Sequence, residues 1–227
     1  MITPQPPSAT DSLAYLRGVD VERISGAGRV VALTFDAGAN ADGLPAILAT
    51  LLRERITATF FLTGDFVARH PTQSRAIAAA GHRLGNHSVD HPHFPALGDA
   101  QIRAQVRGAE QQITAVTGAH PRPFFRFPYG DRTAHTIAVV NQLGYTAVRW
   151  TVDTLGWQGT AEQTAESVTS RVLAAATSGE IVLMHVGSHP TDRSTLDAAA
   201  LPAVIAGLRQ RGYGFVTLDA LRQPQGG

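Results

Sequence analysis

Five polar residues lie where predicted strands of this chain end, and their side chains are of the types that carry hydrolytic chemistry. They are Asp36, His87, Arg126, Asp153 and His185. Each follows or closes a short apolar run that reads as a buried strand. In a parallel barrel the carboxyl ends of the strands form the face where active sites assemble. Separate strands therefore deliver two carboxylates, two imidazoles and a guanidinium to one rim, a set that can transfer protons and hold a metal ion.

His87 and His91 form the strongest local signal in the sequence. They are four residues apart, a spacing that on a helical turn places both imidazoles on one face, where they can share a metal ion. Pro92 disfavours helix at His91, so we expect a single turn rather than a long helix. Paired histidines at this spacing are a usual way to hold zinc, although surface helices also carry such pairs by chance.

The segment Arg126-Phe127-Pro128-Tyr129-Gly130 combines a cation with a rigid turn. Pro128 fixes the backbone, and Gly130 permits a tight bend or a close approach. Such a turn can direct a backbone N–H at a developing oxyanion, although a simple loop has the same composition.

The elements that must position these groups alternate between strand and helix. Strands are expected at 30–35, 58–62, 83–86, 124–127, 145–150, 181–184 and 215–218, and helices at 44–55, 72–80, 99–117, 133–143, 161–176 and 196–211. We expect Asp99 to cap the third of these helices. This alternation predicts an α/β fold with a parallel sheet, and seven or eight strand–helix units favour a small barrel over an open sheet.

Composition limits the remaining possibilities. The 227 residues suffice for one sizeable core, and the net charge of +1 gives no reason to expect nucleic acid as a partner. No apolar run approaches the roughly 20 residues of a membrane-spanning helix. The chain starts with a polar, Pro-rich stretch at 1–10 and ends with a short polar one. We expect a leader or linker at 1–20, a catalytic domain at 21–222 and a short tail at 223–227.

Five motifs in order resemble the polysaccharide deacetylase family, the NodB-homology domain of carbohydrate esterase family 4. They are Thr34-Phe35-Asp36-Ala37-Gly38, His87-Ser88-Val89-Asp90-His91, Arg126-Phe127-Pro128-Tyr129-Gly130, Asp153-Thr154-Leu155-Gly156-Trp157 and Leu183-Met184-His185. The resemblance covers roughly residues 28 to 220. It implies a distorted (β/α) barrel with seven or eight strands and a divalent metal, Zn²⁺ or alternatively Co²⁺.

The resemblance also implies a role for each matching residue. Asp36 is the expected general base and His185 the general acid, with Arg126 holding Asp36 ionised. His87 and His91 are the expected metal ligands. In the substrate site, Tyr129 on the Pro128 turn offers its backbone N–H to the oxyanion, and Trp157 helps to wall the acetyl pocket. Phe127 and Phe94 are further aromatic candidates for stacking against sugars.

Two positions depart from the family pattern. Ala37 stands where the first motif usually has a metal-binding carboxylate, so a second water, Asp36 itself, Asp42, Asp90 or His93 is a candidate for the missing ligand. We expect weaker metal binding than in the usual site. Gly156 stands where the fourth motif usually has the acid that orients the catalytic histidine. Asp153 is a candidate to replace it, and His189 could join the same rim or be a plain loop residue.

The leading hypothesis is a metal-dependent N-deacetylase of an N-acetylglucosamine-type polysaccharide such as peptidoglycan or chitin-like oligomers, acting outside the cytoplasm. An O-acetyl esterase acting on an acetylated glycan is the nearest alternative, because the same groups cleave esters. A catalytically impaired glycan-binding module is the alternative that Ala37 and Gly156 favour. Deacylation of a small metabolite inside the cell is a further, minor alternative.

Overall fold

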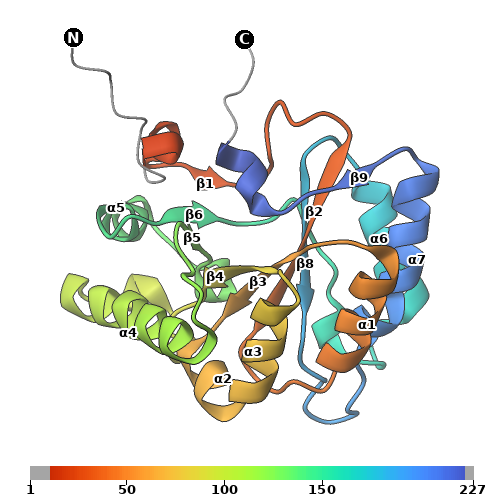
Figure 1. The fold of residues 1–227 in the computed structure, drawn as a ribbon, viewed down its shortest axis with the longest axis horizontal. Coiled ribbons are helices and arrows are strands. Elements are labelled where there is room, and N and C mark those ends of the chain that lie inside the picture. Colours follow the sequence, from red (N-terminus) through yellow and green to blue (C-terminus); the bar gives the residue numbers. More distant parts are fainter. Residues whose placement is uncertain (1–10, 223–227) are drawn as a thin grey trace.

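The strands of the protein pair in parallel in one curved sheet, seen in a computed structural model that describes residues 11–222 (Figure 1). Their order is β1-β6-β5-β4-β3-β2-β8-β7, and β9 pairs with β2 beside this path. The strands are β1 Asp20–Val21, β2 Val30–Ala37, β3 Thr59–Leu62, β4 Arg83–Asn86, β5 Phe124–Phe125, β6 Thr146–Val148, β7 Val152–Asp153, β8 Glu180–His185 and β9 Gly214–Phe215. The predicted distorted (β/α) barrel is confirmed, with eight strands on the main path.

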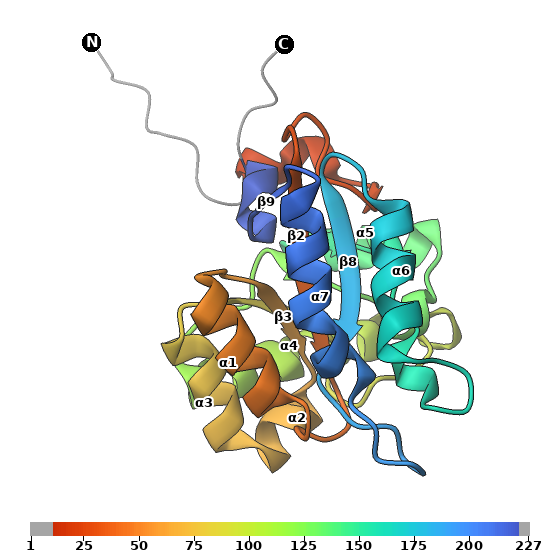
Figure 2. The same cartoon turned by 90° about the vertical axis from the view of Figure 1, so that its right-hand side faces the viewer.

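Helices cover the outer face of this sheet. They are α1 Leu44–Glu54, α2 Gly64–Arg69, α3 Pro71–Ala79, α4 Asp99–Thr117, α5 Ala134–Gln142, α6 Ala165–Ala175 and α7 Leu196–Gln210. Figure 2 shows α7 lying along β8, with α1 and α6 on either side of it. Short 3-10 segments, among them η3 Pro128–Gly130 and η4 Gly156–Gln158, lie in the loops that follow β5 and β7.

The structure corrects several predicted boundaries. Helix α2 and the two-residue strands β1 and β7 were not predicted, because segments this short show little periodicity. Asp99 is the first residue of α4 rather than its cap, which is Gly98. Residues 11–20, expected in a leader, form η1 Asp11–Leu16 and the start of β1, and they bury Leu13 and Leu16 against Leu218 and Leu221. The rest of the expected leader, 1–10, and the tail 223–227 lie outside the described residues.

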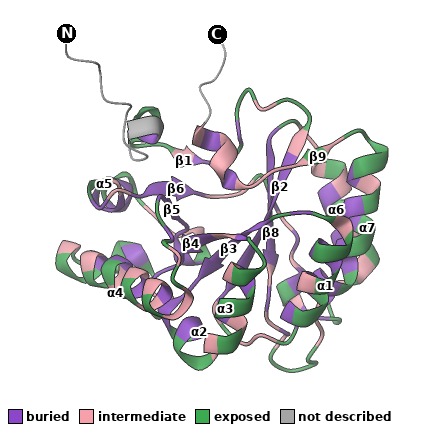
Figure 3. Ribbon diagram, viewed as in Figure 1, coloured by how far each residue is buried: buried purple, intermediate pink, exposed green. Residues whose placement is uncertain are grey.

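Side-chain alternation along the strands separates two layers of core. In β8, Ile181 joins the cluster inside the curved sheet, whereas Val182 joins the cluster between the sheet and helices α1, α6 and α7. The strands are accordingly buried along most of their length, and the helices expose only their outer faces (Figure 3). Among the described helices, none is both long enough and apolar enough to span a bilayer.

Glu180, at the amino end of β8 and far along the strand from His185, is an exception to this apolar pattern. Its side chain is fully buried, and neither carboxylate oxygen has a hydrogen-bond partner among residues 11–222. Burial disfavours the charged form and raises the pKa of Glu180 to about 7. The folded protein therefore binds this proton more tightly than the unfolded chain does.

We expect the substitution Glu180→Gln to stabilise the protein at high pH. A carboxyl whose pKa is raised on folding is stabilising below its unfolded value, near 4.3, and this contribution is lost as the pH rises through about 7. The variant should gain up to about 3 kcal/mol over the parent at pH 8 and little at pH 4, measured by urea unfolding at both pH values. The exposed Glu162→Gln is the control. An equal difference at both pH values would contradict a titrating Glu180.

Candidate active site

A cavity of about 580 Å³ opens at the carboxyl ends of the strands. Most of the predicted site residues line it: Asp36, His87, His91, Tyr129, Trp157 and His185. Asp36 and His185 are direct partners in the register between β2 and β8, so the expected base and acid stand on adjacent strands. The sequence correctly indicated one rim, and the structure shows which of its residues are in contact.

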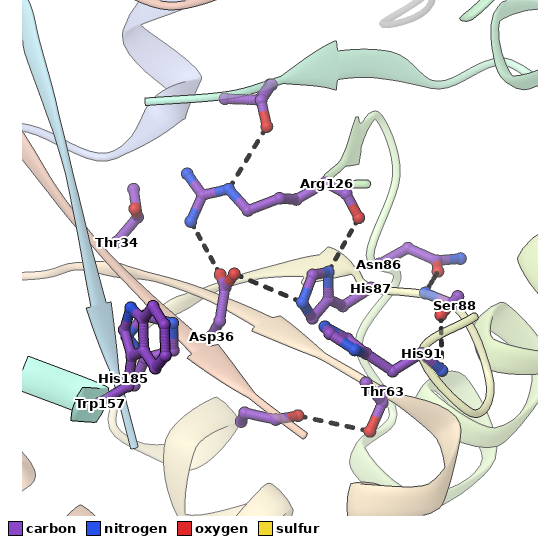
Figure 4. Close-up of polar contacts among 12 residues, drawn as sticks. Thr34, Asp36, Thr63, Asn86, His87, Ser88, His91, Arg126, Trp157 and His185 are labelled. Atoms are coloured by element: carbon purple, nitrogen blue, oxygen red, sulfur yellow. Dashed lines mark hydrogen bonds and ion pairs between the residues drawn. The ribbon is translucent and has the colours of Figure 1, made fainter. Parts of the chain in front are cut away.

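Asp36 is almost completely buried and is paired with the fully buried Arg126, which follows β5. Arg126 Nη1 donates to Asp36 Oδ1 at 2.8 Å (Figure 4). Burial alone would raise the pKa of Asp36, but the Arg126 guanidinium and the neighbouring histidines outweigh burial and lower it. Asp36 is therefore ionised at neutral pH.

The guanidinium of Arg126 is itself fully supported. Its Nε donates to the carbonyl of Val148 at 3.3 Å and its Nη2 to the carbonyl of Arg149 at 2.8 Å. Its planar group also lies over the ring of Phe61, 4.2 Å from the ring centre. These contacts leave Arg126 one orientation, with one edge facing Asp36.

His87 is held in a defined tautomer. Its Nδ1 lies 2.8 Å from the carbonyl oxygen of Arg126, which can only accept, so Nδ1 carries the proton. Burial lowers the pKa of His87, which favours the neutral ring. The unprotonated Nε2 then faces Asp36 Oδ2 across 3.3 Å, placing two electron-rich atoms opposite each other. A histidine that binds metal through one ring nitrogen characteristically donates a hydrogen bond from the other ring N–H to a carbonyl or carboxylate, as His87 does here.

A loop, and not the predicted helical turn, brings His91 to His87. Residues 87–93 contain no helix, and Ser88 and His91 have positive φ angles of 68° and 62°. The Asn86 side chain accepts from the Ser88 N–H, and the Ser88 hydroxyl accepts from the His91 N–H. The two imidazole centres are 4.8 Å apart, and burial lowers the pKa of His91 to about 3. Both rings are therefore neutral, the form that binds metal.

The two histidines fit a divalent ion, but the set of protein ligands is small. Within residues 11–222, no group of three or more His, Cys, Asp or Glu side chains is arranged to hold a metal, whereas catalytic zinc usually has three protein ligands. Ala37 is fully buried in the apolar core, and its carbonyl oxygen accepts from the Thr63 hydroxyl at 3.4 Å.

Three of the candidates for a replacement ligand are engaged elsewhere. Asp42 accepts from Ser188 and Arg193, Asp90 accepts from the Gln105 side-chain amide, and His93 pairs with Asp131. In the structure these three side chains are therefore turned to other partners. Asp36 and water remain as candidates to complete the site.

The turn at Pro128–Gly130 places Tyr129 in a strained position beside the cavity. Tyr129 has φ 58° and ψ 5°, the left-handed region that side chains other than glycine rarely adopt. Pro128, buried, begins the turn, and the Tyr129 side chain is 62% exposed with its ring stacked on His93. Leu155, before Gly156, also has a positive φ of 61°. Such strain concentrates at functional sites.

The aromatic residues separate into wall and core. Trp157 is half-exposed at the cavity, and its indole N–H lies 3.4 Å from Asp153 Oδ2. Phe94 is fully buried and packs on Phe127, so Phe94 offers no surface to a sugar and that prediction is wrong. His189, which the sequence left open, lines the cavity with its Nδ1 3.2 Å from Asp192.

His185 has an acidic partner that the sequence did not indicate. Asp197, in the first turn of α7, accepts the His185 backbone N–H at 2.7 Å and lies 3.4 Å from its Nδ1. Asp153, the predicted replacement, instead accepts from the Leu155 N–H and faces Trp157. Burial alone would lower the pKa of His185, but Asp197, Asp36 and Asp153 outweigh burial and raise it. The only sequence signal was an acid near the start of an apolar helix.

Comparisons with known proteins agree with this geometry. A family model for polysaccharide deacetylase matches residues 23–148. The chain is 33% identical over 193 residues to a peptidoglycan-N-acetylglucosamine deacetylase of Bacillus cereus, covering 85% of this chain and 68% of that protein. It is 37% identical over 202 residues to a chitooligosaccharide deacetylase of a Bradyrhizobium species, covering 85% and 90%.

One of the similar solved structures is described as a pseudoenzyme, in contrast to the relatives named as deacetylases. The fold matches a CE4 family pseudoenzyme from Bacillus anthracis with a TM-score of 0.78 and 28% identity, covering 86% of this chain and 66% of that one. A mutant of that protein is described as having restored enzymatic activity. The same fold thus occurs with and without turnover.

We expect Arg126→Ala to destabilise the protein by about 3–5 kcal/mol, because it leaves the Asp36 carboxylate buried without its partner. The matched control is Arg103→Ala, which removes an exposed helical pair with Asp99 and should cost about 0.3–0.5 kcal/mol. Urea unfolding at pH 7 measures both variants. A loss below about 1 kcal/mol for Arg126→Ala would show that Asp36 does not depend on this pair.

Proposed function

The chain belongs to the polysaccharide deacetylase family, and from that premise we propose that it hydrolyses N-acetyl groups of an N-acetylglucosamine-type polysaccharide. Peptidoglycan and chitin-like oligomers are the proposed substrates, since relatives are deacetylases named for these glycans. One observation carries the proposal. An ionised carboxylate, Asp36, and a histidine with a raised pKa, His185, face one cavity from adjacent strands.

The proposed reaction divides proton transfer between these two residues. Asp36 accepts a proton from the water whose oxygen attacks the acetyl carbonyl carbon, and Arg126 keeps the carboxylate ionised and oriented until then. His185 donates a proton to the departing nitrogen as the carbon–nitrogen bond breaks. One water is consumed, and acetate and a free amine are formed. A pKa lowered at Asp36 and raised at His185 puts both in the required state near neutral pH.

The substrate contacts follow from the turn and the wall of the cavity. We propose that the Tyr129 backbone N–H, held on the Pro128 turn, stabilises negative charge on the acetyl oxygen. Trp157 forms one side of the acetyl site. The exposed rings of Tyr129 and Trp157 offer flat apolar surface to the faces of sugar rings.

We propose that His87 and His91 hold a divalent ion, with zinc first and cobalt second. Such an ion would polarise the acetyl carbonyl and lower the pKa of an attacking water. The neutral state of both rings and the fixed tautomer of His87 support this role. We place the activity outside the cytoplasm, because relatives act on peptidoglycan, which is cell-wall material.

A glycan-binding module without turnover is the second candidate. It is favoured by Ala37, by the small ligand set, and by the match to a pseudoenzyme. The same cavity would then bind the glycan but would not cleave it.

Acetate release tests the proposed activity. Incubated with N-acetylglucosamine oligomers or peptidoglycan, the protein with added zinc should release acetate, and chelator or His91→Ala should abolish the release. His135→Ala, which alters an exposed histidine on α5, should retain full activity. An acetylated xylan assayed in parallel separates N- from O-deacetylation. Glycan binding without acetate release in any metal would favour the binding module and overturn the hydrolase.

Metal binding is testable without turnover. Titration calorimetry should show one zinc bound per chain, and His87→Ala or His91→Ala should weaken binding by at least about tenfold, because each removes one of two protein ligands. His135→Ala again serves as the control. Unchanged affinity in both variants would place the metal elsewhere.

A further inference from the structure

We propose that Asp197 is the positioning residue of His185, and that Gly156 lacks a side chain because the Asp197 carboxylate occupies that space. The inference deepens the proposed function and rests on His185 acting there as general acid. It concerns a residue on helix α7, outside every motif of the site.

The contact geometry links one carboxylate to the backbone and the ring of His185. Asp197 is 3% exposed, and its Oδ2 accepts the His185 N–H at 2.7 Å while lying 3.4 Å from the ring Nδ1. The ring Nδ1 and the second oxygen, Oδ1, are both buried and have no hydrogen-bond partner among the described residues. Hydrogen bonds between catalytic groups are often long before substrate binds, so a small closing movement completes this one.

Gly156 provides the complementary space. A Cβ built on Gly156 would lie 2.4 Å from Asp197 Oδ1 and 2.8 Å from its Cγ, closer than any real contact. Gly156 does not have a positive φ, so its backbone conformation does not require glycine. The requirement is therefore one of space, and a side chain at 156 would exclude the carboxylate at 197.

Helix α7 supplies a suitable place for a buried negative charge. Asp197 lies in the first turn of a 15-residue helix, where free N–H groups and the helix dipole favour an anion. The helix packs directly on η4, which contains Gly156, so carboxylate and glycine belong to one rigid contact. The position is fixed by packing and not by a flexible loop.

The Asp197 carboxyl group defines what His185 can do. It favours a proton on Nδ1, fixes the tautomer and ring orientation, and stabilises the imidazolium. Other titratable groups also face His185. They are Asp36 from β2, Asp153 from β7, and His87 and His91 from the loop after β4. Of the carboxylates, Asp36 is engaged by Arg126, and Asp153 by the Leu155 N–H.

The variant Asp197→Asn in the full chain tests the proposal. With its amide oxygen in the position of Oδ2, the variant side chain can still accept the His185 N–H, so the fold is kept. The negative charge beside Nδ1, which stabilises the imidazolium, is lost. We expect kcat for acetate release to fall about 10- to 100-fold with KM little changed, and the alkaline limb of the pH–rate profile to move to lower pH. A pH titration of the ¹⁵N resonances of the His185 ring should show its pKa moved in the same downward direction.

A matched control and a double variant that moves the carboxylate from position 197 to position 156 complete the test. Glu180→Gln also neutralises a buried carboxyl on the His185 strand, at its opposite end, and should leave kcat and the His185 resonances unchanged. Asp197→Ala combined with Gly156→Asp should recover at least about tenfold of the activity lost in Asp197→Ala, because the carboxylate is returned through the vacated space.

The two failures are distinguishable. If the wild type releases no acetate, the proposed function fails, while the ¹⁵N resonances of His185 in Asp197→Asn still decide the positioning role. Unchanged resonances in that variant, with or without turnover, would overturn the proposal. Unchanged kcat and an unmoved alkaline limb in an active enzyme would overturn it as well.

Discussion

The buried ion pair between Arg126 and Asp36 is the constraint on which the rest of the site depends. Two charges removed from water are tolerated only when their remaining hydrogen-bonding groups are satisfied. Here the Val148 and Arg149 carbonyls accept from Arg126, and the Phe61 ring covers its face. The pair also joins β2 to the loop after β5, across the interior of the curved sheet. The geometry of the strand ends and the charge of Asp36 are therefore set together.

From that pair follows a graded set of protonation states. Asp36 is held ionised, and desolvation keeps His87 and His91 neutral. His185, one strand away, is the histidine of this group whose pKa is raised, because carboxylates face it. In the proposed mechanism, histidines thus serve as metal ligand or as general acid according to their surroundings. This separation of roles is the physical content of the proposed mechanism.

The sequence predicted the frame of the site better than its contacts. Strand–helix alternation and residues at strand ends gave the barrel and the rim, because burial imposes periodicity on long elements. Very short strands such as Val152–Asp153 carry too few residues to show it. The loop around His91 depends on positive φ angles at Ser88 and His91, and neither serine nor histidine predicts such an angle from the sequence. Asp197 was missed because it lies 41 residues from Gly156, and spacing along the chain does not reveal a shared space.

The two departures from the family pattern have different physical meanings. At position 37 the family's usual carboxylate is replaced by an apolar core residue, because Ala37 is fully buried among apolar side chains. Within the described residues, no other acid completes a group of three ligands there. At position 156 the loss is matched. If the family's acid at this position had simply been lost, alanine, serine or asparagine could stand there as well as glycine. Glycine in particular is needed only if another group fills the space that its Cβ would occupy.

Asp197 is that group, and its contact with His185 places a carboxylate beside the ring again from a different element. A site that is only decaying has no reason to keep such a pair of residues fitted to each other. The proposed base, the proposed acid and the proposed partner of that acid are thus all present, and the departure without a replacement is at the proposed metal site. This arrangement favours an enzyme whose metal binding is weakened over a barrel that has lost its chemistry.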